Sequence, residues 1–374
     1  MTATLLGTRV QVREAVADDD AALRGIAAAC PMEGDISLRI TRDPDFFQLN
    51  QLEGSQWRVG VAEVDGRVVG CAMGAERIAY LHGVEQRTLY AGDLKVLPTM
   101  RGTGVADALI RWVMAELLDM GGPGVPILLT VLAGNRAMER RTSGRGTTPG
   151  VAHFATMRAF SLPLLFPRAF KDSGLRVSTA TSRDIEEMLE LWSHVAPARQ
   201  LAPVLTAETF ERWIARAPGL DISSYRLARD ASGRLAGFMA WWDQATFKQS
   251  HVLRYSRRLR VARALLNGAA TLTRGTPLPD VGELLRYCTA LNVCVPGEAP
   301  EVLRALVRSS YAELRDAGYA FATIGLDVRD PLCGALNGLF AQPTDVNAFV
   351  YTTSGDYAGR SLADRPLHYE IALV

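Results

Sequence analysis

Cysteine is scarce in this chain of 374 residues, which has only five, an odd number. No two of them are separated by two residues and the chain is long, so neither a disulfide framework nor a zinc site is indicated. The five histidines form no HxxxH or HExxH pattern, and we expect no metal site. Most of the cysteines stand among apolar residues, which predicts buried, unreactive thiols at most of positions Cys30, Cys71, Cys288, Cys294 and Cys333.

The sequence also lacks a long apolar run and a charge of one sign. No uninterrupted apolar stretch approaches the roughly 20 residues needed to span a bilayer, and the first residues lack the basic start and apolar run of a secretion signal. The 41 Lys and Arg against 40 Asp and Glu give a formal net charge of +1. Such a balance gives no general reason to bind nucleic acid or an anionic membrane. We therefore expect a cytoplasmic protein with no nucleic-acid or membrane partner.

The sequence does contain an internal repeat, in which four short segments of the first half recur in the same order in the second. The matched pairs are 9–15 with 175–180, 66–70 with 233–237, 94–96 with 291–293, and 115–119 with 312–316. The offset is 167 at the second pair and 197 at the third and fourth, so the second copy holds 30 extra residues between Ala240 and Leu291. From residue 94 onward the two copies are expected to align without a gap.

The repeat divides the chain into two predicted domains. We expect an N-terminal domain over residues 1–165 and a C-terminal domain over 166–374, with an insertion around 250–283. The segment Ser161–Arg168 contains two prolines and is the predicted linker. Within the insertion, the arginine-rich segment Ser256–Leu272 is expected to be a solvated basic helix, with a partner-binding helix as the alternative.

Both domains have an α/β pattern. In the first, alternation and turn residues predict strands, and apolar residues at three- and four-residue spacing predict a helix over Val105–Met120 that ends at Gly121-Gly122. In the second, the same helical spacing over Leu303–Leu314 precedes a predicted strand over Tyr319–Val328. The predicted strands of the first domain are 57–63, 67–73, 88–97 and 127–132. The fold class is therefore α/β, with helices flanking a central sheet in each of two tandem domains.

A glycine-rich turn joins the predicted strand 88–97 to the helix that follows it. The first turn of a helix leaves about four backbone N–H groups without internal partners, and its dipole favours an anion there. Gly102 and Gly104 lack the Cβ atoms that would keep a phosphate from those amides, and Arg101 adds a permanent charge. No Gly-Lys-Ser/Thr follows, and Asp107 stands where a dinucleotide fingerprint needs its third glycine. The turn therefore predicts a pyrophosphate site that is neither a P-loop nor a Rossmann fingerprint.

The pattern Arg101-x-x-Gly104-x-Ala106, after a strand that reads Leu-x-Val-x-Pro, resembles motif A of the GNAT acyltransferase superfamily. The resemblance covers most of residues 8–160 and implies a mixed, mostly antiparallel sheet in each domain. It also implies that acetyl-CoA or another acyl-CoA binds, with its pyrophosphate at the turn, its pantetheine arm along the preceding strand, and Asn135 facing it. The implied binding residues are Leu94, Val96, Arg101, Gly102, Thr103, Gly104, Val105, Ala106 and Asn135.

The second copy of the turn differs from the first. At an offset of 197, residues 101–106 fall on 298–303, where glutamates replace the arginine and one glycine. Pro300 also removes one amide donor. Carboxylates suit an empty helix N-terminus but would repel a pyrophosphate. The C-terminal domain is thus expected to be a degenerate GNAT-like domain without a cofactor.

The family resemblance also implies a catalytic base. In the family this is commonly a carboxylate on the strand that leads into motif A, which corresponds to Asp93 here. Glu63, Glu76 and the C-terminal carboxylate of Val374 are alternatives.

The general acid departs from the family pattern. A tyrosine commonly follows the asparagine by six or seven residues, but Arg141 and Thr142 hold these positions after Asn135. Either Tyr90 or Tyr80 supplies the proton, or the thiolate leaves unassisted. The arginines of this segment are candidates for binding the adenosine 3′-phosphate or an acidic acceptor, or they belong to a solvated loop: Arg136, Arg140, Arg141 and Arg145.

The leading hypothesis is an acyl-CoA-dependent N-acyltransferase in which an amine attacks the thioester directly. The acceptor is expected to be a small-molecule or peptide amine, and a homo-oligomeric state is left open. Two alternatives are an acyl-CoA-binding protein without catalysis and a structural or regulatory tandem domain.

Overall fold

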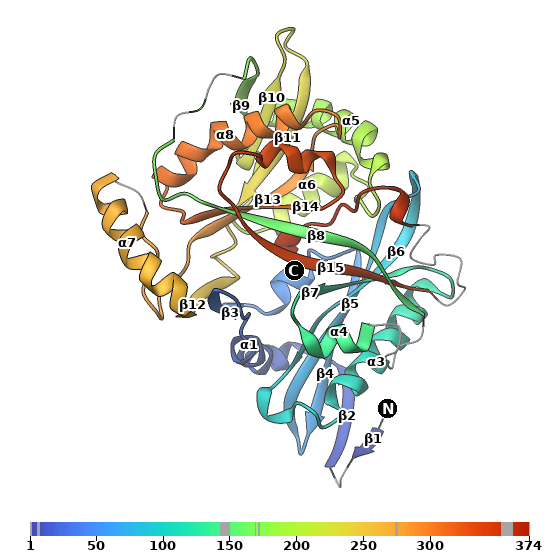
Figure 1. The fold of residues 1–374 in the computed structure, drawn as a ribbon. Helices are drawn as coiled ribbons and strands as arrows, with labels where there is room; N and C mark the ends of the chain where they lie inside the picture. The colour runs from blue at the N-terminus through green and yellow to red at the C-terminus, as the bar shows by residue number, and fades with distance from the viewer. Residues whose placement is uncertain are drawn as a thin grey trace.

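The computed structural model describes residues 2–5, 8–142, 150–168, 170, 173–273, 276–352 and 362–373. One 13-stranded sheet runs through the molecule with helices on both of its faces (Figure 1), and its strand pairs are antiparallel except for two parallel ones. In sheet order the strands are β1 (Thr2–Leu5), β2 (Thr8–Glu14), β4 (Gln56–Val64), β5 (Arg67–Leu81), β6 (Val84–Val96), β7 (Ile127–Leu132), β15 (Gln342–Tyr351), β8 (Val151–Pro163), β14 (Phe321–Asp327), β13 (Tyr287–Cys294), β11 (Leu235–Trp242), β10 (Tyr225–Arg229) and β9 (Arg176–Thr179). The predicted α/β class with a mostly antiparallel sheet is confirmed.

A second, two-stranded sheet and eight α-helices complete the described fold. The small sheet pairs β3 (Ile36–Thr41) with β12 (Gln249–Tyr255). The helices are α1 (Asp20–Ala29), α2 (Phe47–Asn50), α3 (Val105–Gly121), α4 (Arg136–Thr142), α5 (Ile185–Val195), α6 (Ala207–Arg216), α7 (Arg257–Thr273) and α8 (Pro300–Asp316).

The two halves of the chain exchange strands at the centre of the large sheet. β15, from the second half, lies between β7 and β8 of the first half and pairs with both. β8 in turn pairs with β14 of the second half, and β8 and β15 cross the middle of the molecule side by side (Figure 1). Each half therefore completes its part of the sheet with a strand of the other. The division at residue 165 stays a prediction about the repeat, and the sheet itself is continuous across it.

The predicted linker is wrong in its first part. Residues 161–163 are the end of β8, where Ser161 pairs with Thr323 and Pro163 with Phe321. Pro163 is the last residue of the strand, where the missing N–H breaks no ladder inside it.

The helix predicted over Val105–Met120 is α3, and it ends at Gly122, whose φ is +80°. Its apolar stripe is buried, as the spacing predicted, and consists of Val105, Leu109, Trp112, Val113 and Leu117. Glycine in β4 permits the close approach of the helix, because a Cβ at Gly60 would lie 2.3 Å from the Trp112 ring. α1 packs on the opposite face of the same strands, beside Val59 and Val61.

The structure repeats the crossover β6–α3–β7 as β13–α8–β14, each with a parallel strand pair. The expected gap-free alignment is wrong, however. The connection before α3 spans 97–104, eight residues, whereas the connection before α8 spans 295–299, five residues. The second half therefore has a shorter turn at the place where the first has its glycine-rich one.

The structure has extra elements in the part of the second half where an insertion is predicted. β5 and β6 form a direct hairpin, but β12 and α7 stand between β11 and β13. The segment Ser256–Leu272, predicted to be helical, corresponds to α7. Through β12 the insertion pairs with β3, near the start of the chain.

The cysteine prediction holds at three positions. Cys71, Cys288 and Cys294 are buried, Cys30 and Cys333 are half-buried, and all five are free thiols. Burial raises the pKa of Cys71 to about 12, so this thiol stays protonated and unreactive at neutral pH.

The strand exchange predicts one cooperative unfolding transition, although the sequence repeats. Residues 1–165 alone would leave β7 without β15, and residues 166–374 alone would leave β14 without β8. Calorimetry of the whole chain should give a single peak, and the two fragments made separately should not give folded protein. Two resolved transitions, or a stably folded fragment, would contradict this account.

Candidate functional site

β6 and β7 part from one another in the middle of the first half. They pair in parallel only from Leu89 to Ala91 of β6, although β6 continues to Val96. The pairing of β6 with β5 shifts register between Cys71 and Met73, which is a β-bulge. Asp93 lies within this bulge with φ of +55°, a conformation that aspartate tolerates better than most residues. Among the described residues, no strand thus pairs with the edge of β6 beyond Ala91 on the β7 side.

The glycine-rich turn lies at the end of this free edge. Residues 98–100 form a 3₁₀ turn, Gly102 has φ of +81°, and Gly104, with φ of +84°, is the N-cap of α3. A Cβ placed on Gly102 would meet nothing within 4 Å, so open space lies over this residue. Glycine is needed here for its conformation and leaves the first amides of α3 accessible.

A cavity of about 1050 Å³ follows the free edge of β6 to the turn. Ala106, Ile110 and Met114 of α3 line one side of it, and Arg42 and Glu53 line another. The cavity therefore passes between the parted strands.

Most of the residues implied by the resemblance line this cavity. They are Leu94, Val96, Arg101, Gly102, Gly104, Ala106 and Asn135. Two others do not line it, because Val105 is fully buried in the core and the Thr103 hydroxyl donates to the Met100 carbonyl at 2.7 Å. Arg136 and Arg141 also line the cavity, whereas Arg145 lies outside the described residues.

Asp93 is the centre of a buried ionic network. Arg42 binds its carboxylate through both terminal nitrogens, at 2.5 and 2.9 Å, and Lys95 forms a second ion pair. Asn50 donates from Nδ2 to the same carboxylate at 3.3 Å. Burial by itself would raise the pKa of Asp93, but the charges of Arg42 and Lys95 hold it far below its ordinary value. These ion pairs make Asp93 a weak proton acceptor.

Lys248 lies close to this network. Its Nζ donates to the Ala372 carbonyl at 3.3 Å. Burial, with the nearby charges of Arg42 and Lys95, lowers the pKa of Lys248 to about 7.

Tyr90 lies where the strands part. Its hydroxyl is 3.0 Å from the Thr130 Oγ1 of β7, and both residues line the cavity. Arg77 stacks between the rings of Tyr90 and Tyr369, with its guanidinium 4.7 and 4.9 Å from their centroids. Tyr90 is therefore fixed in place in the wall of the cavity.

The other candidate acids and bases lie elsewhere. Glu63 is 2.6 Å from Arg13, and Glu76 pairs with Arg87 at 3.3 Å. The Tyr80 hydroxyl is 3.4 Å from Glu85 Oε1. None of the three described residues Glu63, Glu76 and Tyr80 lines the cavity. Val374 lies outside the described residues.

Three charged residues of the site were missed by the sequence reading. Arg42 follows β3 in an unremarkable Arg-Asp-Pro segment, and Glu53 lies after α2, far from the turn in sequence. Lys95 lies within the predicted strand 88–97, two positions after Asp93, and this spacing indicates that the two side chains share one face of the strand.

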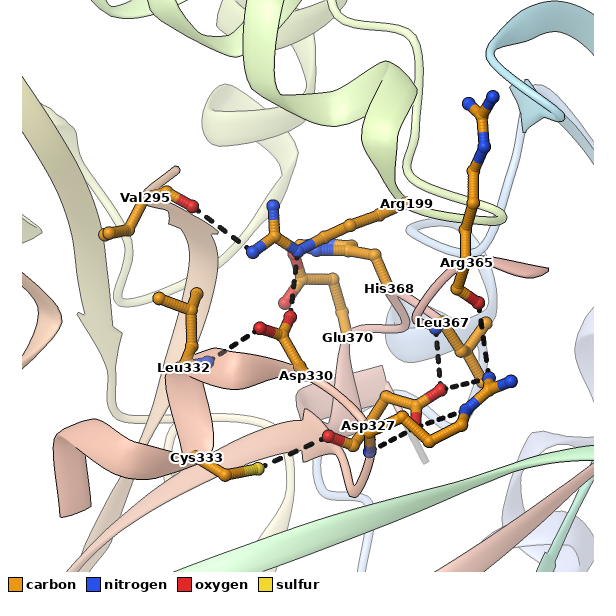
Figure 2. Close-up of polar contacts among 11 residues, drawn as sticks. Arg199, Val295, Asp327, Asp330, Leu332, Cys333, Arg365, Leu367, His368 and Glu370 are labelled. Atoms are coloured by element: carbon orange, nitrogen blue, oxygen red, sulfur yellow. Dashed lines mark hydrogen bonds and ion pairs between the residues drawn. The ribbon is translucent and has the colours of Figure 1, made fainter. Parts of the chain in front are cut away.

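The C-terminal segment supplies one wall of the cavity through Leu373. Figure 2 shows the polar contacts that hold the preceding residues: Asp327 accepts from the Leu367 amide at 2.7 Å, and His368 lies 2.9 Å from Glu370. Beside them, Arg199 donates to Asp330 at 3.0 Å and to the Val295 carbonyl at 3.2 Å. The second half of the chain thus carries a rigid segment to the site in the first.

The fold resembles that of several solved structures. It matches N-myristoyltransferase of Saccharomyces cerevisiae with bound myristoyl-CoA at a TM-score of 0.61 and 13% identity, over 94% of this chain and 84% of that one. It also matches a GCN5-related N-acetyltransferase from Sphaerobacter thermophilus at a TM-score of 0.54 and 16% identity, over 91% and 95% of the two chains. At these identities the likeness is one of fold.

A match to a known family lies in the first half of the chain. Residues 27–140 are similar to the acetyltransferase (GNAT) family. The match includes β6, the glycine-rich turn and α3. No sequence among the curated proteins matches the chain.

Two searches for other features are negative over the part of the chain that is described. No helix there is long and apolar enough to cross a membrane. Within the same residues, no three His, Cys, Asp or Glu side chains are grouped to hold a metal ion.

The Asp93 network predicts a pH-dependent contribution to stability. Arg42→Met removes the bidentate partner and should lower the free energy of unfolding by about 3 kcal/mol at pH 7. Because the pKa of Asp93 is lowered in the folded state, its stabilising effect is complete above its unfolded pKa and is lost as the pH falls below it. Urea titrations should therefore show a deficit in the variant that shrinks below pH 4.

The triple variant Arg42→Met/Asp93→Asn/Lys95→Met is the control, since it removes all three charges of the cluster. It should be more stable than Arg42→Met alone at pH 7. A deficit of Arg42→Met that is constant from pH 3 to pH 8 would show that the network is not ionic in origin.

Proposed function

We propose that the protein is an acyl-CoA-dependent N-acyltransferase, in which an amine attacks the thioester directly. The observation that carries the proposal is the cavity of about 1050 Å³ that follows the free edge of β6 to the turn before α3. Acetyl-CoA or another acyl-CoA is the co-substrate, and the acceptor is a small-molecule or peptide amine. The fold supports this class, because the similar structures are an N-acetyltransferase and an N-myristoyltransferase with bound myristoyl-CoA.

The turn fits the pyrophosphate of such a co-substrate. An anion bound at the turn would meet the first backbone amides of α3 and the positive end of its helix dipole. Gly102 and Gly104 have no side chains, which leaves room for that anion. Arg101 and Arg136 both line the cavity and add permanent positive charge. Asn135 lines the cavity beside Arg136.

The free edge of β6 fits an extended chain that carries amide groups. In the described part of the chain, no strand pairs on the β7 side with the backbone N–H and C=O groups from Gly92 to Val96. The pantetheine arm would take this place as a short additional strand does, with its amides bonded to the β6 backbone. The thioester would then lie near the bulge, between Tyr90 and Asp93.

Tyr90 is the proposed general acid. When the new C–N bond has formed and the C–S bond breaks, the departing thiolate needs a proton. The Tyr90 hydroxyl is placed to donate it, and Thr130 orients that hydroxyl from β7.

Asp93 is proposed to act by positioning rather than as the base. Its ionised carboxylate is held by Arg42 and Lys95, and these bonds fix the left-handed residue of the bulge. Glu63 lies outside the cavity, tied to Arg13, so we give it no part in the reaction.

A second candidate function is acyl-CoA binding without catalysis. The residues that occupy the usual tyrosine positions favour it: Arg141 pairs with Asp107 at 2.8 Å, and the Thr142 hydroxyl donates to the Met138 carbonyl at 3.0 Å. Both side chains have structural partners and supply no acid.

We further propose that the C-terminal domain, within the predicted limits 166–374, binds no cofactor. Its turn before α8 has five residues instead of eight, and Pro300 opens the helix. Arg199 bonds the carbonyl of Val295 in that turn and is itself paired with Asp330. The Arg199 side chain thus lies against the backbone of this turn. The proposed role of the domain is that of a scaffold.

Acetyl-CoA should raise the melting temperature of the protein by a few degrees at saturation, because it binds only the folded chain. Gly102→Asp should abolish the shift, since it places a carboxylate and a Cβ over the turn. Gly233→Asp is a matched control: Gly233 also has a positive φ, and its Cβ would also meet nothing within 4 Å. Calorimetric titration should give one site per chain, and absence of any shift in the parent protein would refute the proposal.

Tyr90→Phe should lower kcat about 100-fold with little change in the KM for acetyl-CoA, because the hydroxyl is needed only as the thiolate departs. Tyr80→Phe is the control, since that hydroxyl lies outside the cavity near Glu85. Free thiol release with a panel of amines provides the measurement. If binding occurs and no amine supports release in the parent protein, the non-catalytic alternative is correct.

A further inference from the structure

The solvent-facing side of α7 combines positive charge with exposed aliphatic side chains. The helix has 17 residues and contains no acidic one. Leu259 and Leu266 face inward and join a small apolar cluster with Tyr255 and Leu278. The opposite side carries Val261 and Leu265, whose exposed fractions are 68% and 73%.

Exposed large aliphatic residues concentrate in this insertion. Leu253 in β12 and Val281 in the loop after α7 are 38% and 62% exposed. Together with Val261 and Leu265 they are four of the ten large hydrophobic side chains found exposed in the described residues. Single exposed aliphatic residues are ordinary, but Val261 and Leu265 lie one helical turn apart on the same side of α7 and form a small apolar surface.

Arginines surround this group. Arg257, Arg258 and Arg260 are exposed at the start of α7, and no ion pair to any of the three occurs among the described residues. In contrast, Arg254 pairs with Glu33, and Arg263 pairs with Asp280 at 2.6 Å. The near-neutral charge of the whole chain therefore conceals a local excess of positive charge.

The surface adjoins the mouth of the cavity. The Ser256 amide, just before α7, donates to the Asp35 carbonyl at 2.8 Å. Glu33, which pairs with Arg254, and Gly34 both line the cavity. Figure 1 shows α7 projecting from the body of the molecule beside β12 and β3. A partner bound to α7 would therefore lie next to the entrance of the site.

We infer that α7 binds the surface of an anionic phospholipid membrane, with its arginines at the headgroups and Val261 and Leu265 between them. Helices that lie in the membrane interface combine these two features, and each arginine gains from an anionic surface. A nucleic acid would bind the arginines but would gain nothing from exposed aliphatic side chains. The insertion also has no exposed aromatic ring on which a base could stack, since its Tyr255 is buried. A second copy of the same surface would be repelled by the like charges. The chain gains a peripheral membrane contact that keeps the mouth of the cavity near the bilayer.

Vesicle co-sedimentation tests the inference. The whole protein should pellet with vesicles of phosphatidylglycerol and phosphatidylcholine in equal parts, and not with phosphatidylcholine alone. Arg257→Glu/Arg258→Glu and, separately, Val261→Ser/Leu265→Ser should each weaken binding at least about tenfold. Binding by the unaltered protein should also weaken as salt is raised, a result that depends on no variant.

Matched controls come from exposed residues elsewhere on the chain. Arg176→Glu/Arg183→Glu makes the same charge change, and Val84→Ser/Phe340→Ser removes apolar groups of similar exposure; neither should affect binding. A Leu265→Trp reporter should be quenched by brominated lipid, whereas Phe340→Trp should not.

Three outcomes would overturn the inference. One is no binding to anionic vesicles at physiological salt. Another is an equal loss of vesicle binding in the control variants. The third is that only the arginine variant loses vesicle binding and that duplex DNA competes fully with the vesicles. This result would make α7 a nucleic-acid-binding surface instead.

Discussion

The separation of β6 from β7 is the constraint on which the site depends. Two parallel strands that pair over three residues and then diverge leave backbone groups that must find another partner. The divergence is fixed by an ionic cluster: Asp93 takes the left-handed conformation of the bulge, and Arg42 and Lys95 neutralise its buried carboxylate. A hydrophobic bulge residue would lack these bonds and would not tolerate the conformation as well. The same cluster therefore shapes the edge of β6 and lines the cavity beside it.

The second half of the chain contributes to this site without repeating it. It supplies Leu373 to the cavity wall, β15 to the edge of β7, and β12 to the sheet that continues from the cavity mouth. Its own turn is three residues shorter, and its surroundings are filled by Arg199. The repeated crossover tolerates a shorter turn, because the sheet and the helix behind it do not need the turn to be long. The second half shares with the first the packed elements of the crossover, namely two parallel strands and the helix between them.

The sequence predicted the fold class, α3 and the glycine-rich turn because each depends on local rules: helical spacing, glycine at positive φ, and a strand that ends at proline. Features that depend on tertiary contacts were missed or predicted wrongly. Nothing near Arg42 in the sequence indicates that it reaches Asp93, since that contact spans 51 positions. The linker prediction failed at Ser161 because strand exchange draws this segment into the sheet. The gap-free alignment of the two halves could not reveal that the second turn is shorter, because no local pattern shows where the strand ends and the helix begins.

The placement of β15 also determines the order in which the molecule can be completed during synthesis. The first half includes β7, yet the neighbour of β7 on its open side is a strand that begins at Gln342. Ribosomes synthesise the chain from its N-terminus, so the edges of β7 and β8 that pair with β15 stay unpaired while residues 164–341 emerge. A nascent chain halted before β15 would expose these edges to aggregation, and chaperone protection over that interval would serve this protein more than one whose domains close in sequence.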